Sequence, residues 1–375
     1  MKCTANSRRA KVKLDIRDYT PSLRWRQAEY QSLLFLPEQR KDRICPLVTI
    51  PPLEFDFELG VPKKTPHQHV HPFATRLKKK WGTRPCWVDL HPTLREALMD
   101  DGRVTYQYVF EDLRDDRATA IPVASLDMSL TTLKVIGDIV SKDQLGLGLR
   151  LTLVDLIHPD KVARSLAVMN AVGCDISETD LLVDIEAPNY DPLVPFVNAL
   201  ISQLRAFPIL EQFRNFALIG TGFPESMAGI ATGASSIPRN HWIFYQSLIG
   251  SLTSVGRLPN FGDYTITHPG FVAMDMRMVK PAGKVIYATD NYWHVEKGGS
   301  FRDNRDQMYD HCDAIVLLSE FKGSSYSFGD HYITQCAARS EGTSNLTRWK
   351  HVGISHHMTV VLDDLASFHA GAWPS

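Results

Sequence analysis

The chain has 375 residues, a formal net charge of −1, and 44% hydrophobic and 22% charged residues, an ordinary composition for a soluble protein of one large domain or two to three smaller ones. The balanced charge excludes an overall attraction to nucleic acid or to a membrane surface, although it says nothing of local basic patches. No apolar run reaches the roughly 18 residues that a membrane-spanning helix needs, and the polar start of the chain lacks the apolar core of a secretory signal, so we expect a cytoplasmic protein with no membrane partner.

Strands and helices are predicted to alternate along the first half of the chain. Short apolar runs rich in β-branched residues predict strands, and longer runs with apolar residues at helical spacing predict helices. Asp160 is a candidate N-terminal cap for one of these helices. In chain order, strands are expected at 19–25, 44–50, 86–90, 121–126 and 147–154, and helices at 29–36, 73–81, 130–140 and 160–172.

The same alternation continues in the second half. The strands are continuously apolar, which is typical of strands covered on both faces, and their alternation with helices indicates parallel pairing. An apolar, helix-like run ends the pattern at 358–365. Strands are expected at 181–186 and 216–220, helices at 192–205 and 242–252, and an eighth strand at 263–267 or, alternatively, at 284–289.

About eight such units in roughly 270 residues predict a (β/α)8, TIM-barrel-like fold. The alternative is an open doubly wound sheet, but the first strand is not followed by a glycine-rich phosphate loop. We expect residues 1–280 to form the barrel domain. Residues 281–375 would supply the last unit or units and a capping region packed on the same domain.

In a barrel, side chains that follow the carboxyl ends of strands are the functional candidates. Several carboxylates that converge there could hold a divalent metal ion or act as acid and base. Alternatively, Asp89 and Asp184 cap helices or pair with arginines such as Arg24 and Arg150. The candidates by position are Arg24, Arg26, Glu29, Asp89, His91, Asp127, Asp155, His158, Asp184 and Glu186.

Two pairs of basic residues are further candidates. Arg24 and Arg26 lie two residues apart on a predicted strand, so they would share a face and form a fork for phosphate or carboxylate, or else pair with Glu29. His356 and His357 precede the last apolar run. At a helix start one would cap the helix and the other would face a pocket, whereas the alternative is a purely structural role.

The remaining patterns point to ligand contacts more than to catalysis. Asp263, in Phe261-Gly-Asp-Tyr264, is either satisfied by backbone amides or contacts a ligand. The three histidines of 67–71 lie in a long loop, 51–72, with no cysteine or carboxylate nearby, and the six cysteines are scattered, so we predict no metal site and reduced, buried thiols. No cofactor is indicated. The side chains expected to contact a ligand are Arg24, Arg26, Arg150, Tyr264, Asp330 and Trp349.

Five blocks of the chain occur in the order in which one known family has them. Tyr19-Thr-Pro-Ser-Leu-Arg-Trp-Arg-Gln-Ala-Glu29 is similar to its opening, with arginines in place of lysines and Ala28 in place of a glycine. Cys45-Pro-Leu-Val-Thr-Ile50 is similar to its second block, although Thr49 stands where a glutamate is common. The later blocks are 261–264, 321–330 and 349–357. Together they resemble the Beta proteins of bacteriophages, phage satellites and bacterial genomes.

The resemblance implies a cytosolic protein of phage or mobile-element context. In phage satellites the Beta protein is encoded beside a host-killing protein, Gop, whose toxicity it is thought to restrain within an anti-phage module, and other relatives are encoded beside nuclease-like partners. The resemblance therefore implies a protein partner, toxin or nuclease-like, that is encoded nearby. It supplies no catalytic residue.

Two hypotheses follow. The first is a binding component of a phage-defence or toxin–antitoxin-like module, which recognises a protein partner or an infection signal. The second is a metal-dependent hydrolase of a phosphate-bearing nucleotide or nucleic acid, with arginines on the phosphate, aspartates as metal ligands or base, and one of the paired histidines as acid or base. Convergence of Arg24, Glu29, Asp184, Asp263 and His357 in one pocket would favour the enzyme, whereas dispersal into buried pairs would disfavour it.

Overall fold

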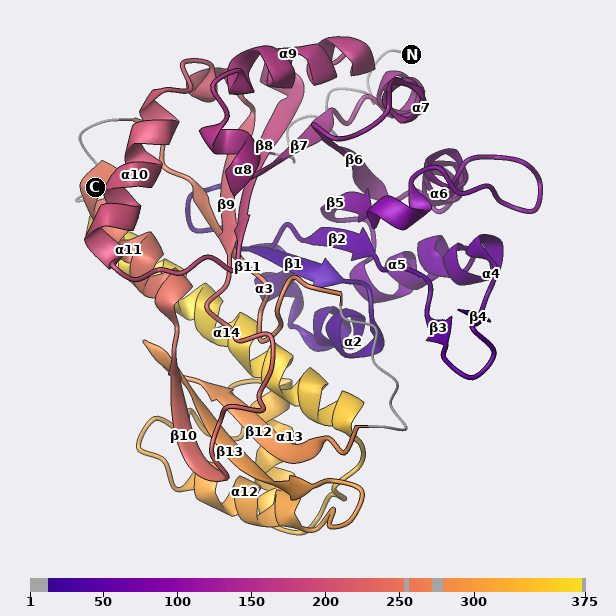
Figure 1. The fold of residues 1–375 in the computed structure, drawn as a ribbon. Helices are drawn as coiled ribbons and strands as arrows, with labels where there is room; N and C mark the ends of the chain where they lie inside the picture. Colours follow the sequence, from indigo (N-terminus) through magenta and orange to yellow (C-terminus); the bar gives the residue numbers. More distant parts are fainter. Residues whose placement is uncertain (1–12, 253–255, 272–278, 373–375) are drawn as a thin grey trace.

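A closed barrel of eight parallel strands forms most of the molecule (Figure 1). The structure is a computed structural model that describes residues 13–252, 256–271 and 279–372. The strand order β1-β11-β9-β8-β7-β6-β5-β2 confirms the predicted (β/α)8 barrel and shows that the open-sheet alternative is wrong. The barrel strands are β1 (Thr20–Arg24), β2 (Leu47–Ile50), β5 (Pro85–Leu90), β6 (Thr119–Ser125), β7 (Leu147–Thr152), β8 (Thr179–Glu186), β9 (Asn215–Gly220) and β11 (Asn260–Asp263).

Helices surround the barrel, and most lie where apolar periodicity predicts them. The helix predicted at 73–81 has those bounds, but α6 was not predicted because its buried face is made of Thr, Tyr, Val and Phe, which favour strands as single residues. Asp160 precedes its helix but makes no side-chain capping bond. The helices are α2 (Gln27–Phe35), α3 (Glu38–Lys41), α5 (Phe73–Trp81), α6 (Thr105–Asp115), α7 (Leu130–Asp143), α8 (Leu153–Ile157), α9 (Lys161–Val172), α10 (Leu193–Arg205) and α11 (Asn240–Leu252).

The eighth barrel strand is β11, so the prediction of 263–267 begins three residues late and the alternative at 284–289 belongs to another sheet. The long connection over 51–72 contains a short hairpin, β3 (Phe55–Asp56) and β4 (Val61–Pro62), and helix α4 (Pro66–Val70). Because its first histidines lie on a helix, the three imidazoles of 67–71 do not line one face of an extended chain.

A second, smaller sheet follows the barrel. Strands β12 (Ala282–Ala288) and β13 (Tyr292–Ser300) pair antiparallel, and β10 (Gly233–Pro238), which comes from between β9 and α11, pairs with β13. Helices α12 (Gln307–Val316) and α13 (Phe328–Ala337) lie beside this sheet (Figure 1). Their contacts form a separate apolar core, to which Val285 and Tyr287 of β12 contribute.

Helix α14 (Leu346–Ala372) joins the two parts, because it packs on α2 of the barrel and on β12 and α13 of the smaller unit (Figure 1). Every residue from 351 to 362 is buried, so the middle of the helix is enclosed on all sides rather than amphipathic. The helix starts twelve residues before the predicted apolar run at 358–365. The histidine pair therefore lies in the middle of a helix and not at its start.

The five cysteines within the described residues are free and buried, as predicted, and Cys3 lies outside those residues. In the part of the chain that the structure describes, no helix is both long and apolar enough to cross a lipid bilayer.

Candidate functional site

A cavity of about 460 Å³ lies between the carboxyl ends of the barrel strands and the smaller sheet; we call it the mouth pocket. This volume is within the range of about 300–1000 Å³ that is usual for small-molecule sites. Its walls come from the end of β1, the segments that follow β9 and β11, strand β12 and the start of α14. Apolar side chains such as Phe223, Ile266, Ile286 and Trp349 make up much of the lining.

Four cationic side chains line the mouth pocket: Arg24, Arg26, Lys284 and Lys350. The guanidinium carbons of Arg24 and Arg26 lie 5.4 and 5.9 Å from the ring centre of Phe271, so both arginines contact the same aromatic ring. They do not share a strand face, however, because Arg26 is the N-terminal capping residue of α2. The predicted fork is therefore formed by a strand end and a helix start.

Glu29 is the buried counter-charge of this group. Its side chain is 1% exposed, and its carboxylate lies 3.6 Å from Arg24 Nε and 3.4 Å from Lys350 Nζ. It also accepts a hydrogen bond of 3.2 Å from the backbone N–H of Arg26, as the third residue of a capping box does. The ion pair with Glu29 that was the alternative interpretation of the two arginines is therefore present for Arg24. The carboxylate of Glu29 is occupied by these internal contacts and is not available to a ligand.

The second candidate group lies inside the barrel. Arg150 donates to Asp89 at 2.8 Å, to Asp184 at 2.6 and 3.0 Å, and to the hydroxyl of Tyr264 at 3.2 Å. Tyr264 in turn donates to Asp184 at 2.5 Å, and Tyr106 donates to Asp89 at 3.2 Å. Both aspartates are at most 1% exposed. Their charges are therefore balanced by Arg150, by Arg95, which lies 3.9 Å from Asp89, and by neutral donors.

The third group is centred on Asp263, which is fully buried. Its carboxylate accepts from His357 Nε2 at 2.7 Å, from His241 Nε2 at 3.3 Å, from the Thr265 amide at 2.8 Å and from the Tyr19 hydroxyl. Burial raises the pKa of Asp263, but the two histidines and their hydrogen bonds outweigh it and hold that pKa far below its usual range. Burial also lowers the pKa of His241 to about 4.

The position of the proton on each of these two imidazoles is fixed by a group that donates a hydrogen bond to the other ring nitrogen, Nδ1. The Trp293 indole donates to His357 Nδ1 at 3.2 Å, and the Gly222 amide donates to His241 Nδ1 at 3.3 Å. Each Nδ1 therefore carries a lone pair, and each Nε2 carries the hydrogen that points to Asp263. The arrangement is a charged carboxylate between two neutral imidazoles, closed to solvent on all sides.

The fourth group pairs His356 with Asp330, both fully buried. Nδ1 of His356 lies 2.8 Å from Asp330, and Nε2 lies 2.8 Å from the carbonyl oxygen of Ala288. Tyr287 donates to Asp330 at 2.8 Å and stacks on the imidazole, with ring centres 3.8 Å apart. This group binds α14 to β12 and α13. It is separate from the mouth pocket.

The predicted candidates therefore disperse into four hydrogen-bonded groups and do not converge in one pocket. Of the residues expected to contact a ligand, Arg24, Arg26 and Trp349 line the mouth pocket, whereas Arg150, Tyr264 and Asp330 are bound internally. The remaining strand-end candidates are local caps or surface pairs, except Glu186, which is exposed at the end of β8. His91 and His158 accept from nearby amides, Asp155 completes a capping box, and Asp127 pairs with Arg95 at 3.0 Å.

Lys284, Lys350 and Phe271 were not among the predicted site residues. Lys350 lies within the block 349–357, and Lys284 lies within a predicted strand, so both were visible as charged residues in otherwise apolar segments. Their convergence could not be predicted because it depends on how β12 and α14 pack against the barrel. Among the described residues, no group of three or more histidines, cysteines and carboxylates has the arrangement of a metal site.

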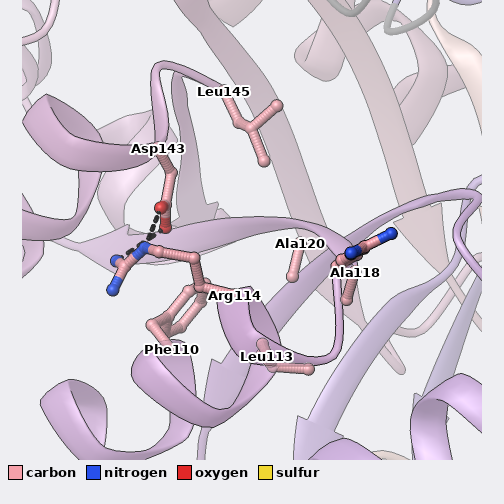
Figure 2. A pocket seen from close by; sticks show the side chains of 8 residues that line it. Phe110, Leu113, Arg114, Ala118, Ala120, Asp143 and Leu145 are labelled. Carbon is pink, nitrogen blue, oxygen red and sulfur yellow. Dashed lines mark hydrogen bonds and ion pairs between the residues drawn. The ribbon is translucent and has the colours of Figure 1, made fainter.

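Other cavities lie at the opposite end of the barrel, near the amino ends of the strands. Figure 2 shows one of about 200 Å³ between α6 and α7, in which Arg114 bonds to Asp143 through two nitrogens, one of them at 3.1 Å. A wider depression of about 840 Å³ contains Lys41 and Arg84, which pair with acidic neighbours. Since barrel sites lie at the carboxyl ends of the strands, the mouth pocket is the best candidate.

Comparison with known proteins adds one solved structure and one family. The X-ray structure of the YdjI aldolase from Escherichia coli K12 is similar at 12% sequence identity and a TM-score of 0.32, over 67% of this chain and 81% of that chain. A search of curated proteins finds none that matches. The family model described as Beta protein matches residues 19–363, nearly the whole chain, and the chain therefore belongs to the Beta protein family.

Proposed function

We propose that this protein is the ligand-binding component of a phage-defence or toxin–antitoxin-like module and that a small anionic molecule, as an infection signal, binds in the mouth pocket. The observation that carries this proposal is the excess of positive charge in that pocket. Four cationic side chains surround it, whereas three carboxylates supply negative charge near them: Glu225 in the lining, Glu29 beside Arg24 and Lys350, and Glu54 near Arg26. Burial lowers the pKa of His268, which leaves that histidine neutral at pH 7.

The charge balance favours an anionic ligand. Four cations against three carboxylates leave positive charge uncompensated, and a phosphate monoester or a dicarboxylate would neutralise it. Arginine is suited to both groups because its planar fork matches their oxygens. The apolar walls and the Phe271 ring suit a ligand whose body is apolar or aromatic.

The position of the pocket suggests how ligand binding could reach a partner. One wall belongs to the barrel, and the other belongs to β12 and α14. A bound anion would bridge the two and would stabilise the arrangement in which both walls contact it. We propose that a protein encoded nearby, toxin or nuclease-like, distinguishes the ligand-bound arrangement from the free one.

The test is a ligand panel monitored by thermal denaturation and isothermal titration calorimetry. Nucleoside monophosphates and aromatic dicarboxylates should raise the melting temperature, whereas the matched neutral nucleosides should not. Arg26→Ala should weaken binding about tenfold or more, since charge-assisted hydrogen bonds contribute about 1.5–3 kcal/mol. Arg302→Ala, at an exposed position on the smaller unit, is the matched control and should change nothing.

Two outcomes would contradict the proposal. If no dianion shifts the melting temperature, the mouth pocket is not an anion site. If a nucleotide is bound and its phosphate is released in the presence of a divalent metal ion, the hydrolase is the better description. The dispersal of the acidic and histidine candidates into internal pairs argues against that second outcome, because general acids and bases must reach the substrate.

A further inference from the structure

We infer that Lys284 is a nucleophilic amine that captures an aldehyde or ketone ligand as an imine in the mouth pocket. The inference rests on the proposed function, because the anionic part of the ligand would be held by the cations already described. It adds the reacting group of the ligand: a carbonyl attached to a carboxylate or a phosphate.

Strand geometry directs Lys284 into the pocket. In β12, side chains alternate between the two faces of the sheet. Val285 and Tyr287 point into the core formed with α12 and α13, whereas Lys284 and Ile286 line the mouth pocket. The side chain of Lys284 is thus half-buried against apolar neighbours rather than extended into solvent.

Among the described residues, no carboxylate pairs with the ammonium group of Lys284. Lys350 lies 3.4 Å from Glu29, and Lys297 donates to the backbone carbonyls of Met227 and Ile230 at 2.8 and 2.5 Å. In the described part of the chain, Lys284 forms neither an ion pair nor a side-chain hydrogen bond. The half-buried amine is therefore not engaged by an acceptor among the described residues and can contact a ligand in the mouth pocket.

The surroundings favour the neutral, nucleophilic amine. Burial lowers the pKa of Lys284, and the neighbouring charges of Lys297 and Lys350 lower it further. Desolvation and a nearby cation are the two effects that activate lysines which form Schiff bases. Lys350 differs because Glu29 opposes the lowering of its pKa.

The reaction balances without a further reagent. The lone pair of Nζ attacks the carbonyl carbon and forms the C–N bond, and the carbonyl oxygen takes up a proton to give a carbinolamine. Loss of water then forms the imine, so that both hydrogens of the neutral amine leave with the former carbonyl oxygen. Arg24 and Arg26 would hold the anionic end of the ligand and so limit the orientations of the carbonyl.

The experiment traps the imine in the full-length protein with sodium cyanoborohydride at pH 7. Pyruvate supplies a ketone with a carboxylate, glycolaldehyde phosphate supplies an aldehyde with a phosphate, and glycolaldehyde is the neutral control. Peptide mass spectrometry then gives the rate of modification at each lysine. Lys284 should react about tenfold or more faster than Lys134, which is exposed on α7, with at least one anionic probe. Lys284→Arg should lose that modification and keep the melting temperature.

The outcomes separate this inference from the proposed function. If Lys284 reacts no faster than Lys134 with any probe, the inference is overturned, even where a dianion without a carbonyl still raises the melting temperature. If Lys284 reacts as fast with glycolaldehyde as with its phosphate, the amine is reactive but the anion site is not used, which counts against the proposed function. A preference for pyruvate or for the phosphate identifies which anion the pocket selects.

Discussion

Asp263 joins residues that are far apart in the sequence, because its donors come from the residue before β1, the turn after β11, α11 and α14. His357→Ala would remove one hydrogen-bond donor to the buried carboxylate and leave a cavity in a fully buried site. We expect a loss of about 3 kcal/mol in the free energy of unfolding. His357→Gln keeps a donor and should recover part of that loss. Urea denaturation measures both, with His331→Ala, exposed on α13, as the control; equal stability of His357→Ala and wild type would show that the bond is not structural.

His241 makes stability depend on pH in a defined direction. Burial lowers its pKa from the usual 6.5 to about 4 in the folded protein. Between these values the unfolded chain binds a proton at this residue and the folded chain does not, so stability falls as pH falls. From pH 7 to pH 5 we expect His241 to contribute a loss of about 2 kcal/mol.

Other buried histidines act in the same direction, since burial lowers the pKa of His351 to about 3 and also lowers that of His357. Denaturant melts at pH 7 and pH 5 measure the total. In His241→Gln the difference between the two pH values should shrink by about 2 kcal/mol, whereas in His331→Gln it should not change. A wild-type protein as stable at pH 5 as at pH 7 would rule out this account.

At the scale of elements, two helix backbones approach each other closely where α13 crosses α14. A Cβ atom added at Gly329 would come within 2.3 Å of the carbonyl oxygen of Val352. Gly329→Ala should therefore force the helices apart and cost about 1–3 kcal/mol. Gly250→Ala, in helix α11 where an added Cβ meets no atom of the described residues within 4 Å, should instead be neutral or stabilise by up to about 1 kcal/mol. Thermal melts of both variants test this close contact. If Gly329→Ala has the melting temperature of the wild type, the two helices can move apart without a loss of stability.

The elements differ in how far the sequence could predict them. Barrel strands such as β8 and β9 were found because a strand covered on both faces is a continuous apolar run. Helix α14 was recognised only from Met358 onward, because its earlier polar residues interrupt the apolar pattern. Lys350, His356 and His357 are bonded there to partners up to 321 residues away in the sequence, and such partners cannot be predicted from local spacing.

The same reason limits what could be predicted about the site. The arginines that follow β1 were found because strand ends in a barrel are functional positions. The other half of the mouth pocket comes from β12 and α14, whose approach to the barrel depends on the network around Asp263 and on the pairing of Asp330 with His356. The sequence therefore predicted which residue types matter, but only the structure shows that they form four separate hydrogen-bonded groups rather than one catalytic group.

For the whole molecule, we propose that the barrel and the smaller sheet fold as one unit. Strand β10 (Gly233–Pro238) lies between two barrel elements in the sequence but pairs with β13 of the smaller sheet. Helix α14 follows the smaller sheet in the sequence but packs on α2 of the barrel. A cut at residue 280 would place β10 and β13 on different fragments, and likewise α2 and α14. It would also expose the apolar surface of β11 and α11 that α14 covers, including Trp242, which contacts Phe368.

Separate expression of 1–280 and 281–375 should therefore give two fragments without stable tertiary structure, whereas the intact chain should unfold in a single cooperative transition. Circular dichroism in the near ultraviolet and calorimetry distinguish these states. Co-expression of the two fragments is the control, since β10 and α14 could then find their partners and restore a folded complex. A soluble fragment 281–375 with its own cooperative melt would show instead that the smaller unit is an independent domain, and the mouth pocket would then be an interface between two domains whose relative position a ligand can change.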